Sequence, residues 1–209
     1  MNCPLCDSDR PCSPVISMNR AFLRCRICNL VFVDTIYHLS ASAEKKRYET
    51  HENIPFDVRY LKHLSRLIDP VVGLLSPGSH GIDFGCGPGP AVSRIMSSKG
   101  FSVENYDPFF ADDKTLLCRI YDFLISTEVI EHLRYPSEEF RLIKSIVKKG
   151  GIIGIMTNFS DGKDLSDWFY TRDPTHIAFY SQKTFYWIAK RFKLDIETIK
   201  DPLAIFRNR

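Results

Sequence analysis

The histidines at positions 132 and 176 are the best candidates in the sequence for accepting a proton during a reaction. An imidazole exchanges its proton near neutral pH, so it can act as a general base. His176 lies in the aromatic stretch 168–180, which is too long and too aromatic for a simple connection. We expect this stretch to form a lid and one wall of a pocket. The alternative is that His176 is a hydrogen-bonded structural residue.

Two carboxylates precede His132 in the run Thr-Glu-Val-Ile-Glu-His. One helical turn would bring Glu128, Glu131 and the imidazole together. Such a set can bind Mg²⁺ or a similar ion and activate a hydroxyl group, with His176 as a more distant ligand. The interpretation we favour is that Glu128 lines a ligand pocket, while Glu131 and His132 hold the start of the following helix.

The N-terminal segment carries a metal-binding pattern of cysteines. Five of the seven cysteines fall in the first 28 residues, and four of them form two C-x-x-C pairs: Cys3, Cys6, Cys25 and Cys28. Four thiolates with this spacing match tetrahedral Zn²⁺ and predict about one zinc per chain. Strands expected near 23–25 and 30–33 complete a zinc ribbon over residues 1–39, whose small core depends on the metal. Cys12 is either a spare cysteine or a replacement ligand.

The charge balance gives little support for binding nucleic acid. The net charge is +3, from 28 basic and 25 acidic residues, and the ribbon carries four arginines against three aspartates. This is a weak electrostatic footprint for RNA, so we favour a ribbon that stabilises the fold or walls the substrate site. We find neither a signal segment nor an apolar run near the length of about 20 that spans a bilayer. We therefore expect a cytoplasmic protein that does not enter the membrane.

A glycine-rich turn organises the rest of the chain, in the run Gly-Ile-Asp-Phe-Gly-Cys-Gly-Pro-Gly-Pro over 81–90. A strand ends in an acid, and the turn then opens a helix over 91–99. Glycines let the backbone approach a ligand closely, and the helix start offers unpaired N–H groups. Pro90 replaces the last glycine of the dinucleotide fingerprint. The carboxylate of Asp83 suits a cationic ligand better than a pyrophosphate.

Further elements are expected on both sides of this turn. A strand over 101–106 ends at Asp107, about 20 residues past the turn, where an acid binds ribose hydroxyls. Strands are also expected at 116–120, 121–126 and 151–157. Before the turn, we expect helices at 42–48 and 57–68, the second ended by Pro70. Tyr48, His51 and Tyr60 could reach a ligand, although packing and surface roles are favoured for them.

These motifs together resemble class I S-adenosylmethionine (SAM)-dependent methyltransferases. The matching segments are Asp-Phe-Gly-Cys-Gly-Pro-Gly, Asn-Tyr-Asp, Phe-Leu-Ile-Ser-Thr-Glu-Val-Ile-Glu-His-Leu and Lys-Lys-Gly-Gly-Ile-Ile, and Asp-Pro-Thr-His-Ile-Ala-Phe-Tyr-Ser resembles the small-molecule subfamily. The resemblance implies an α/β fold with a Rossmann-like, seven-stranded, mostly parallel sheet and helices on both faces. It implies a zinc-ribbon-like module at 1–39, a helical connector or lid at 40–77 and a SAM-binding domain at 78–209. The Glu128 to His132 spacing also resembles metal-assisted quinol O-methyltransferases.

The resemblance implies where SAM binds. Three glycines of the turn would hold the methionine part, Asp83 would face its ammonium group and Asp107 its ribose. The full expected set is Asp83, Gly85, Cys86, Gly87, Gly89, Asp107, Pro108 and Glu128.

The sequence thus predicts a SAM-dependent methyltransferase that acts on a small hydroxyl- or amine-bearing metabolite, such as a sugar or a quinol. His176 and His132 are the candidate bases. One alternative is an RNA methyltransferase whose ribbon docks the nucleic acid. Another is a SAM-binding or zinc-ribbon interaction protein without catalysis.

Overall fold

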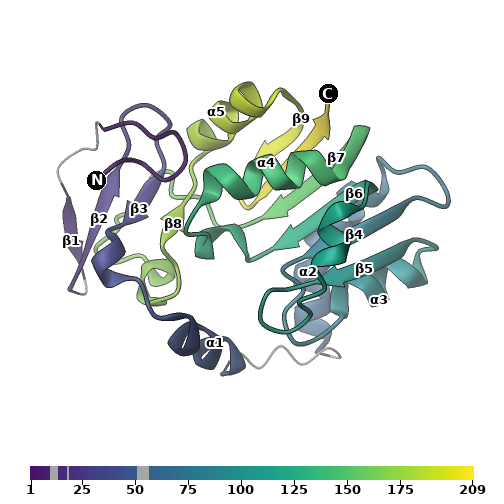
Figure 1. Cartoon of the computed structure of the whole chain (residues 1–209), viewed down its shortest axis with the longest axis horizontal. Helices are drawn as coiled ribbons and strands as arrows, with labels where there is room; N and C mark the ends of the chain where they lie inside the picture. The colour runs from purple at the N-terminus through teal and green to yellow at the C-terminus, as the bar shows by residue number, and fades with distance from the viewer. Residues whose placement is uncertain (10–13, 18, 51–56) are drawn as a thin grey trace.

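A computed structural model of the chain describes residues 1–9, 14–17, 19–50 and 57–209. Figure 1 shows a small sheet of N-terminal strands beside a larger α/β unit, with a helix, α1 (Ala41–Glu49), after the small sheet. Cys12 and His51, both considered as ligand-binding residues, lie outside the described residues. No described helix is long and apolar enough to cross a membrane.

The larger sheet has six strands among the described residues, in the order β5-β4-β6-β7-β10-β9. Their bounds are β4 His80–Phe84, β5 Ser102–Tyr106, β6 Tyr121–Thr127, β7 Val147–Met156, β9 Leu194–Lys200 and β10 Leu203–Asn208. The pairs of β4 with β5, β4 with β6 and β6 with β7 are parallel, while β10 runs antiparallel to β7 and β9. The prediction of an α/β fold is confirmed, and the sheet is mixed because β10 runs antiparallel to both of its neighbours.

The prediction of a seventh strand at 116–120 is wrong for this structure. The segment contains a 3-10 helix, Lys114–Cys118, instead. Asp113 starts this helix by accepting a hydrogen bond from the backbone N–H of Thr115 at 3.0 Å. The hydroxyl of Tyr121 donates to the carbonyl of Leu116 at 3.0 Å and holds the helix against β6. Only thirteen residues, 108–120, lie between Asp107 and the start of β6, so the connection is short.

Helices cover both faces of this sheet. Successive residues of a strand point to opposite faces, so Phe123 and Leu124 of β6 belong to two different apolar clusters. Phe123 packs with residues of α2 (Val58–Val72) and α3 (Ala91–Ser98), and Leu124 with residues of α4 (Pro136–Ile146) and α5 (Gln182–Phe192). The predicted helices on both faces are therefore present.

Helix α2 continues past Pro70, where the sequence predicts its end. Proline lacks the N–H for one helical hydrogen bond and disfavours a helix interior. However, Leu67, Ile68 and Val71 are fully buried against the sheet. Burial of each such side chain contributes about 1.5–3 kcal/mol, which is comparable to the local cost of the proline.

Within the described part of the chain, the small sheet has four antiparallel strands in the order β1-β2-β3-β8. Strands β1 (Val15–Ser17), β2 (Arg20–Arg24) and β3 (Val31–Val33) come from the N-terminal segment, and a 3-10 helix, Thr35–Tyr37, follows them. The fourth strand, β8 (Ala178–Phe179), comes from the far side of β7 in sequence. Leu5, Leu30 and Phe32 also belong to the apolar cluster under α4 and α5. The N-terminal segment therefore shares a sheet and a core with the larger unit.

Candidate functional site

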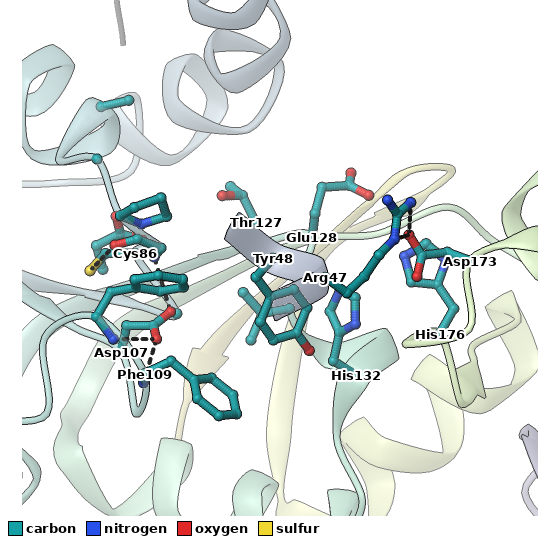
Figure 2. Close-up of a pocket in the computed structure, with 18 of the residues that line it drawn as sticks. Arg47, Tyr48, Cys86, Asp107, Phe109, Thr127, Glu128, His132, Asp173 and His176 are labelled. Carbon is teal, nitrogen blue, oxygen red and sulfur yellow. Dashed lines mark hydrogen bonds and ion pairs between the residues drawn. The ribbon is translucent and has the colours of Figure 1, made fainter. Parts of the chain in front are cut away.

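A cavity of about 820 Å³ lies where β4, β5 and β6 end. In open α/β sheets, ligands bind at the carboxyl ends of the strands. Figure 2 shows Asp107 and Cys86 at one end of this cavity, Asp173 and His176 at the other, and Glu128 between them. The walls come from the glycine turn, the loop after β5, α1, α2 and the segment around a 3-10 helix, Phe169–Arg172.

All the predicted cofactor residues line this cavity: Asp83, Gly85, Cys86, Gly87, Gly89, Asp107, Pro108 and Glu128. The predicted bases His132 and His176 line it as well, as do Tyr48 and Tyr60. The structure thus brings together residues that are spread over more than a hundred positions of the sequence.

The glycine turn adopts a shape that only glycine fits well. Gly85 and Gly87 have φ angles of +86° and +64°, in the left-handed region. A Cβ at Gly85 would also lie 2.4 Å from a methyl carbon of Val129. The backbone N–H groups of Gly85 and Cys86 donate to the carbonyl of Tyr106 at 2.8 and 3.1 Å. These contacts fix the turn against the end of β5.

Asp107 organises the same end of the cavity. Its Oδ2 accepts a hydrogen bond from the N–H of Gly87 at 3.0 Å, and its Oδ1 accepts from Phe109 and Phe110 at 2.8 and 3.2 Å. A carboxylate oxygen can accept about two hydrogen bonds, so Oδ2 keeps room for a ligand hydroxyl.

Asp83 is a buried acid whose Oδ1 has no hydrogen-bond partner. Burial, and then the charge of Asp107, raises the pKa of Asp83 to about 8. Buried polar atoms are normally hydrogen-bonded, so an unpartnered oxygen in a cavity wall indicates a place for a donor or a cation from a ligand.

Glu128 lies midway along the cavity with a φ of +53°, an unusual conformation for a residue other than glycine. Its Oε2 accepts a hydrogen bond from the hydroxyl of Tyr170 at 2.8 Å. Its Oε1 is buried, makes no hydrogen bond and lies 3.4 Å from Nε2 of His63. Glu128 thus contacts Tyr170 through one carboxylate oxygen and the imidazole of His63 through the other.

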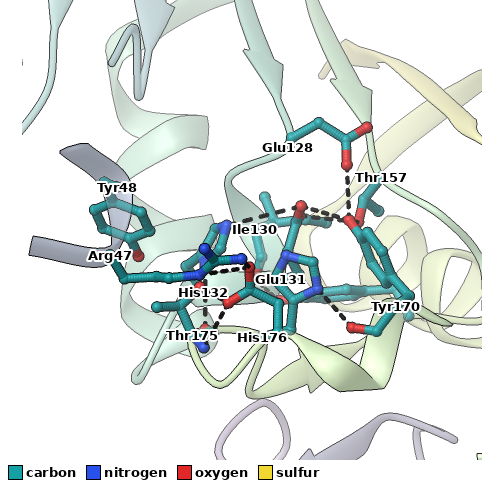
Figure 3. Close-up of polar contacts among 12 residues, drawn as sticks. Arg47, Tyr48, Glu128, Ile130, Glu131, His132, Thr157, Tyr170, Thr175 and His176 are labelled. Carbon is teal, nitrogen blue, oxygen red and sulfur yellow. Dashed lines mark hydrogen bonds and ion pairs between the residues drawn. The ribbon is translucent and has the colours of Figure 1, made fainter. Parts of the chain in front are cut away.

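Glu131 is fully buried, in a short 3-10 helix, Ile130–His132, whose last residue lines the cavity. The hydroxyl of Tyr170, which has one hydrogen for both Glu128 and Glu131, contacts its Oε1, and Thr157 donates to its Oε2 at 2.9 Å (Figure 3). Burial, and then the charge of Glu128, raises the pKa of Glu131 well above its usual range. Tyr170 therefore links two carboxyl groups that lie three residues apart in the sequence.

The two histidines hold the same tautomer. Nδ1 of His132 lies 3.1 Å from the carbonyl of Thr175, and Nδ1 of His176 lies 2.7 Å from the carbonyl of Tyr170. A carbonyl only accepts, so each Nδ1 carries the hydrogen, and Nε2 is the proton-accepting atom of a neutral ring. Nε2 of His132 lies 4.0 Å from Oε1 of Glu131. The ring centroids are 4.8 Å apart, and burial lowers the pKa of His176. Both rings can accept a proton through Nε2.

A family model described as a methyltransferase domain matches residues 56–206. The chain belongs to this family. The prediction of a methyltransferase is therefore confirmed at the level of the family, and the cavity of this methyltransferase domain lies where an α/β domain binds its ligand. A comparison with curated proteins found no match.

Solved structures share the fold of this methyltransferase domain. Phosphoethanolamine N-methyltransferase 2 of Haemonchus contortus, in complex with SAM, has 17% identity and a TM-score of 0.53, over 64% of this chain and 37% of that one. The 1,6-didemethyltoxoflavin-N1-methyltransferase of Burkholderia thailandensis, with bound 1,6-didemethyltoxoflavin and S-adenosylhomocysteine, has 14% identity and a TM-score of 0.58, over 94% of this chain and 99% of that one. The chain spans well under half of the first structure and nearly all of the second.

The described residues do not favour the alternative Mg²⁺ site at Glu128, Glu131 and His132. Ligand atoms of Glu131, His132 and His176 all lie within 4.8 Å of one another, whereas Glu128 is not in this group. Mg²⁺ prefers oxygen ligands, and two imidazoles suit zinc or iron better. Glu131 is also already engaged by Tyr170 and Thr157. We therefore derive no step through a metal at this place.

The four cysteines of the N-terminal segment meet as predicted. Their sulfurs lie within 4.8 Å of one another, with Cys3 to Cys28 at 3.5 Å and Cys6 to Cys25 at 3.4 Å. A disulfide has an S–S bond of about 2.05 Å, while thiolates at about 2.3 Å from a tetrahedral Zn²⁺ stand a little under 4 Å apart. The cysteine geometry fits a zinc ion and not a pair of disulfides.

Tyr170 and Arg47 are cavity residues that the sequence analysis did not single out. Arg47 donates from Nε and Nη2 to Oδ2 of Asp173 at 3.2 and 2.8 Å, which joins α1 to the segment that carries His176. Tyr170 lies in the aromatic stretch expected to form a lid, so its location was predictable. Its contacts were not, because they reach residues about forty positions away.

Proposed function

We propose that this chain is a SAM-dependent methyltransferase that methylates a hydroxyl or amine group of a small metabolite, such as a sugar or a quinol. One observation carries the proposal: a single cavity joins a glycine turn with buried acids at one end to two adjacent imidazoles at the other. The membership in the methyltransferase domain family supports it.

The turn end of the cavity fits SAM. Asp83, with its unpartnered oxygen, would face the ammonium group, and Asp107 would bind the ribose through the lone pair left on Oδ2. The glycines would hold the methionine part, with Cys86, Pro108 and Glu128 beside it. When bound, SAM supplies a methyl group already activated on a sulfonium, so the protein mainly needs to align the acceptor.

The other end of the cavity would hold the acceptor. Tyr48 packs with the ring of His132 at a centroid distance of 5.1 Å and with Phe109 at 5.6 Å, so α1 covers this end. For a hydroxyl acceptor, Nε2 of His132 would take the proton, while the Nδ1–H remains bonded to Thr175. An amine acceptor would need less help from a base. His176 lies behind His132 and is more deeply buried, which favours His132 as the first base.

A compact acceptor is favoured over RNA. A cavity of about 820 Å³ that must also hold SAM leaves room for a small molecule. Arg20, one of the few basic residues of the ribbon, is buried and cannot contact a phosphate. Docking of RNA would need a strongly basic surface, whereas the ribbon has only four arginines against three aspartates.

The N-terminal cysteines would hold one structural Zn²⁺. Four thiolates close the coordination sphere of zinc, so the ion would have no open position for catalysis. The role of this module would be to stabilise the small sheet and the wall of the acceptor site. We keep the division into a ribbon at 1–39, a connector at 40–77 and a SAM-binding domain at 78–209 as part of this proposal.

Titration calorimetry with SAM and S-adenosylhomocysteine tests the cofactor, and radiolabelled SAM with a panel of sugars, quinols and amines then tests transfer. Micromolar binding of both ligands and label transfer to one acceptor class support the proposal. If neither ligand binds to folded, zinc-loaded protein, the proposed SAM-dependent methyltransferase activity is excluded. Binding without transfer to any acceptor, RNA included, would favour the non-catalytic alternative.

A further inference from the structure

Arg20 is a buried arginine that donates hydrogen bonds to several carbonyl groups of one segment distant in sequence. It lies on β2 and is 8% exposed. Its Nη1 donates to the carbonyls of Pro174 and His176 at 3.2 and 3.1 Å. Its Nη2 donates to the carbonyl of Asp173 at 3.0 Å and to that of Thr171. One guanidinium from the N-terminal module thus bonds four carbonyls within residues 171–176.

Arginine is suited to this role because its planar fork directs several N–H donors in fixed directions. Residues 173–176 lie in no helix or strand, although the carbonyl of Asp173 also accepts the backbone N–H of His176 at 3.2 Å. Buried carbonyls without partners destabilise a structure. Burial lowers the pKa of Arg20, although a guanidinium keeps its charge at any ordinary pH. The guanidinium also lies over the ring of Phe22, 5.2 Å from its centroid, which holds it in place.

The same short segment sets the orientation of both imidazoles. The carbonyl of Thr175 accepts the Nδ1–H of His132, and His176 is itself part of the segment. The N–H of Ile177 donates to the carbonyl of Glu131 at 2.8 Å, which fastens the segment to the short helix that carries His132. Any displacement of residues 171–176 would therefore move both rings.

The segment is held from the opposite side by α1. Oδ2 of Asp173 accepts from Arg47, while its Oδ1 accepts from the N–H and hydroxyl of Thr175 at 2.9 and 2.6 Å. Arg20 reaches the backbone and Arg47 reaches a side chain. Arg20 thus holds carbonyls directly adjacent in sequence to those of Thr175 and Tyr170, which are the two carbonyls that orient the rings.

We propose that Arg20 is a positioning residue of the acceptor site. It holds residues 171–176 so that His132 and His176 keep their hydrogens on Nδ1, which leaves Nε2 of each ring as the proton-accepting atom. Arg20 touches neither the proposed cofactor nor the acceptor, and acts only through these carbonyls. The N-terminal cysteine module therefore has a part in the chemistry of the site as well as in stability. The proposal extends the proposed function, but its test does not require turnover.

The test uses the full-length chain with ¹⁵N-labelled histidine and records two-bond ¹H–¹⁵N correlations, which distinguish the two tautomers of each ring. The variants are Arg20→Met, Arg20→Lys and, as a control, Arg26→Met, which changes an exposed arginine of the same module. His132→Gln and His176→Gln assign the signals. Circular dichroism and titration with SAM establish that each variant folds and retains the turn end of the cavity.

In the wild type and in Arg26→Met, both rings should carry the hydrogen on Nδ1 alone. Arg20→Met should give mixed tautomers for both rings, with SAM affinity changed by less than about twofold because the turn end is remote. Arg20→Lys keeps the charge but cannot bond four carbonyls, so it should resemble Arg20→Met. If Arg20→Met does not fold, the lysine variant carries the test. Wild-type tautomers in a folded Arg20 variant, or mixed tautomers in the wild type, would overturn the proposal.

Discussion

The backbone N–H of Gly87 donates a hydrogen bond to Oδ2 of Asp107 at 3.0 Å. The acid proposed to bind the ribose thus also fixes the turn proposed to bind the methionine part. Loss of the Asp107 side chain would disturb both parts of the cofactor site together.

We predict that Asp107→Ala weakens SAM binding at least about tenfold, because hydrogen bonds to a charged group contribute about 1.5–3 kcal/mol each. S-adenosylhomocysteine should lose affinity in parallel, since it has the same ribose. Titration calorimetry measures both. Asp112→Ala is the matched control, because Asp112 is an exposed acid of the same loop. Equal SAM affinities for wild type and Asp107→Ala would exclude Asp107 as a cofactor-binding residue.

The pKa of Asp83 predicts a pH-dependent stability. Its value is about 8 in the folded protein, against 3.8 for an ordinary aspartate. Between these values the folded state keeps a proton that the unfolded state has released, so stability falls as the pH rises through this window. Asp83→Asn removes this contribution. In urea unfolding without cofactor, the variant should gain stability relative to wild type from pH 4 to about pH 8. A constant difference between the two proteins across this range would contradict the pKa assignment.

The cysteine cluster predicts one bound zinc that stabilises the fold. Metal analysis of protein purified without added zinc should find about one zinc per chain. Cys28→Ser should lose the metal and lower the thermal midpoint by about 5 °C or more, because the small sheet has little core of its own. Cys118→Ser, which changes an exposed cysteine, should keep both. Folded protein without zinc would exclude the zinc site.

His132 is predicted to act as the base for a hydroxyl acceptor. His132→Asn should lower kcat about 10²-fold or more while SAM affinity stays unchanged. His80→Asn is a suitable control, since His80 lies at the start of β4 and does not line the cavity. Unchanged turnover of His132→Asn on a hydroxyl acceptor would exclude this role, and His176→Asn would then be the next variant to measure.

Turnover should be independent of Mg²⁺. The described groups near His132 offer two imidazoles and one engaged carboxyl group, a poor set for this ion. Addition of EDTA should leave the rate unchanged, provided that zinc content measured before and after is constant. A rate lost in EDTA and restored by Mg²⁺ would contradict this and return weight to a metal-assisted mechanism.

Features that depend on local spacing were predictable from the sequence. The glycine turn, the acid that follows about 20 residues later and the two C-x-x-C pairs each impose their own geometry. Cys3, Cys28 and Asp107 therefore lie where the sequence placed them, and the matched family agrees with the resemblance.

Features that depend on distant contacts were not predictable. The expected strand at 116–120 is a short helix because its length and its contact with Tyr121 favour a compact connection. Helix α2 continues past Pro70 because burial of its apolar face outweighs one missing N–H. Arg20 looked like an ordinary ribbon arginine, since its partners lie about 150 positions away. The residues adjacent to Arg20 in sequence do not indicate such a distant partner.

The pairing of β3 with β8 sets an order of events for the growing chain. The first three strands of the small sheet are made early, but the fourth comes from residues 178–179. During synthesis the edge of β3 must wait for about 145 further residues, and such long-range pairing is slow to form. A fragment that begins at residue 40 would lack β1, β2 and β3 and would leave the carbonyls of residues 171–176 without Arg20. The N-terminal strands and residues 171–179 therefore have to fold together as one unit.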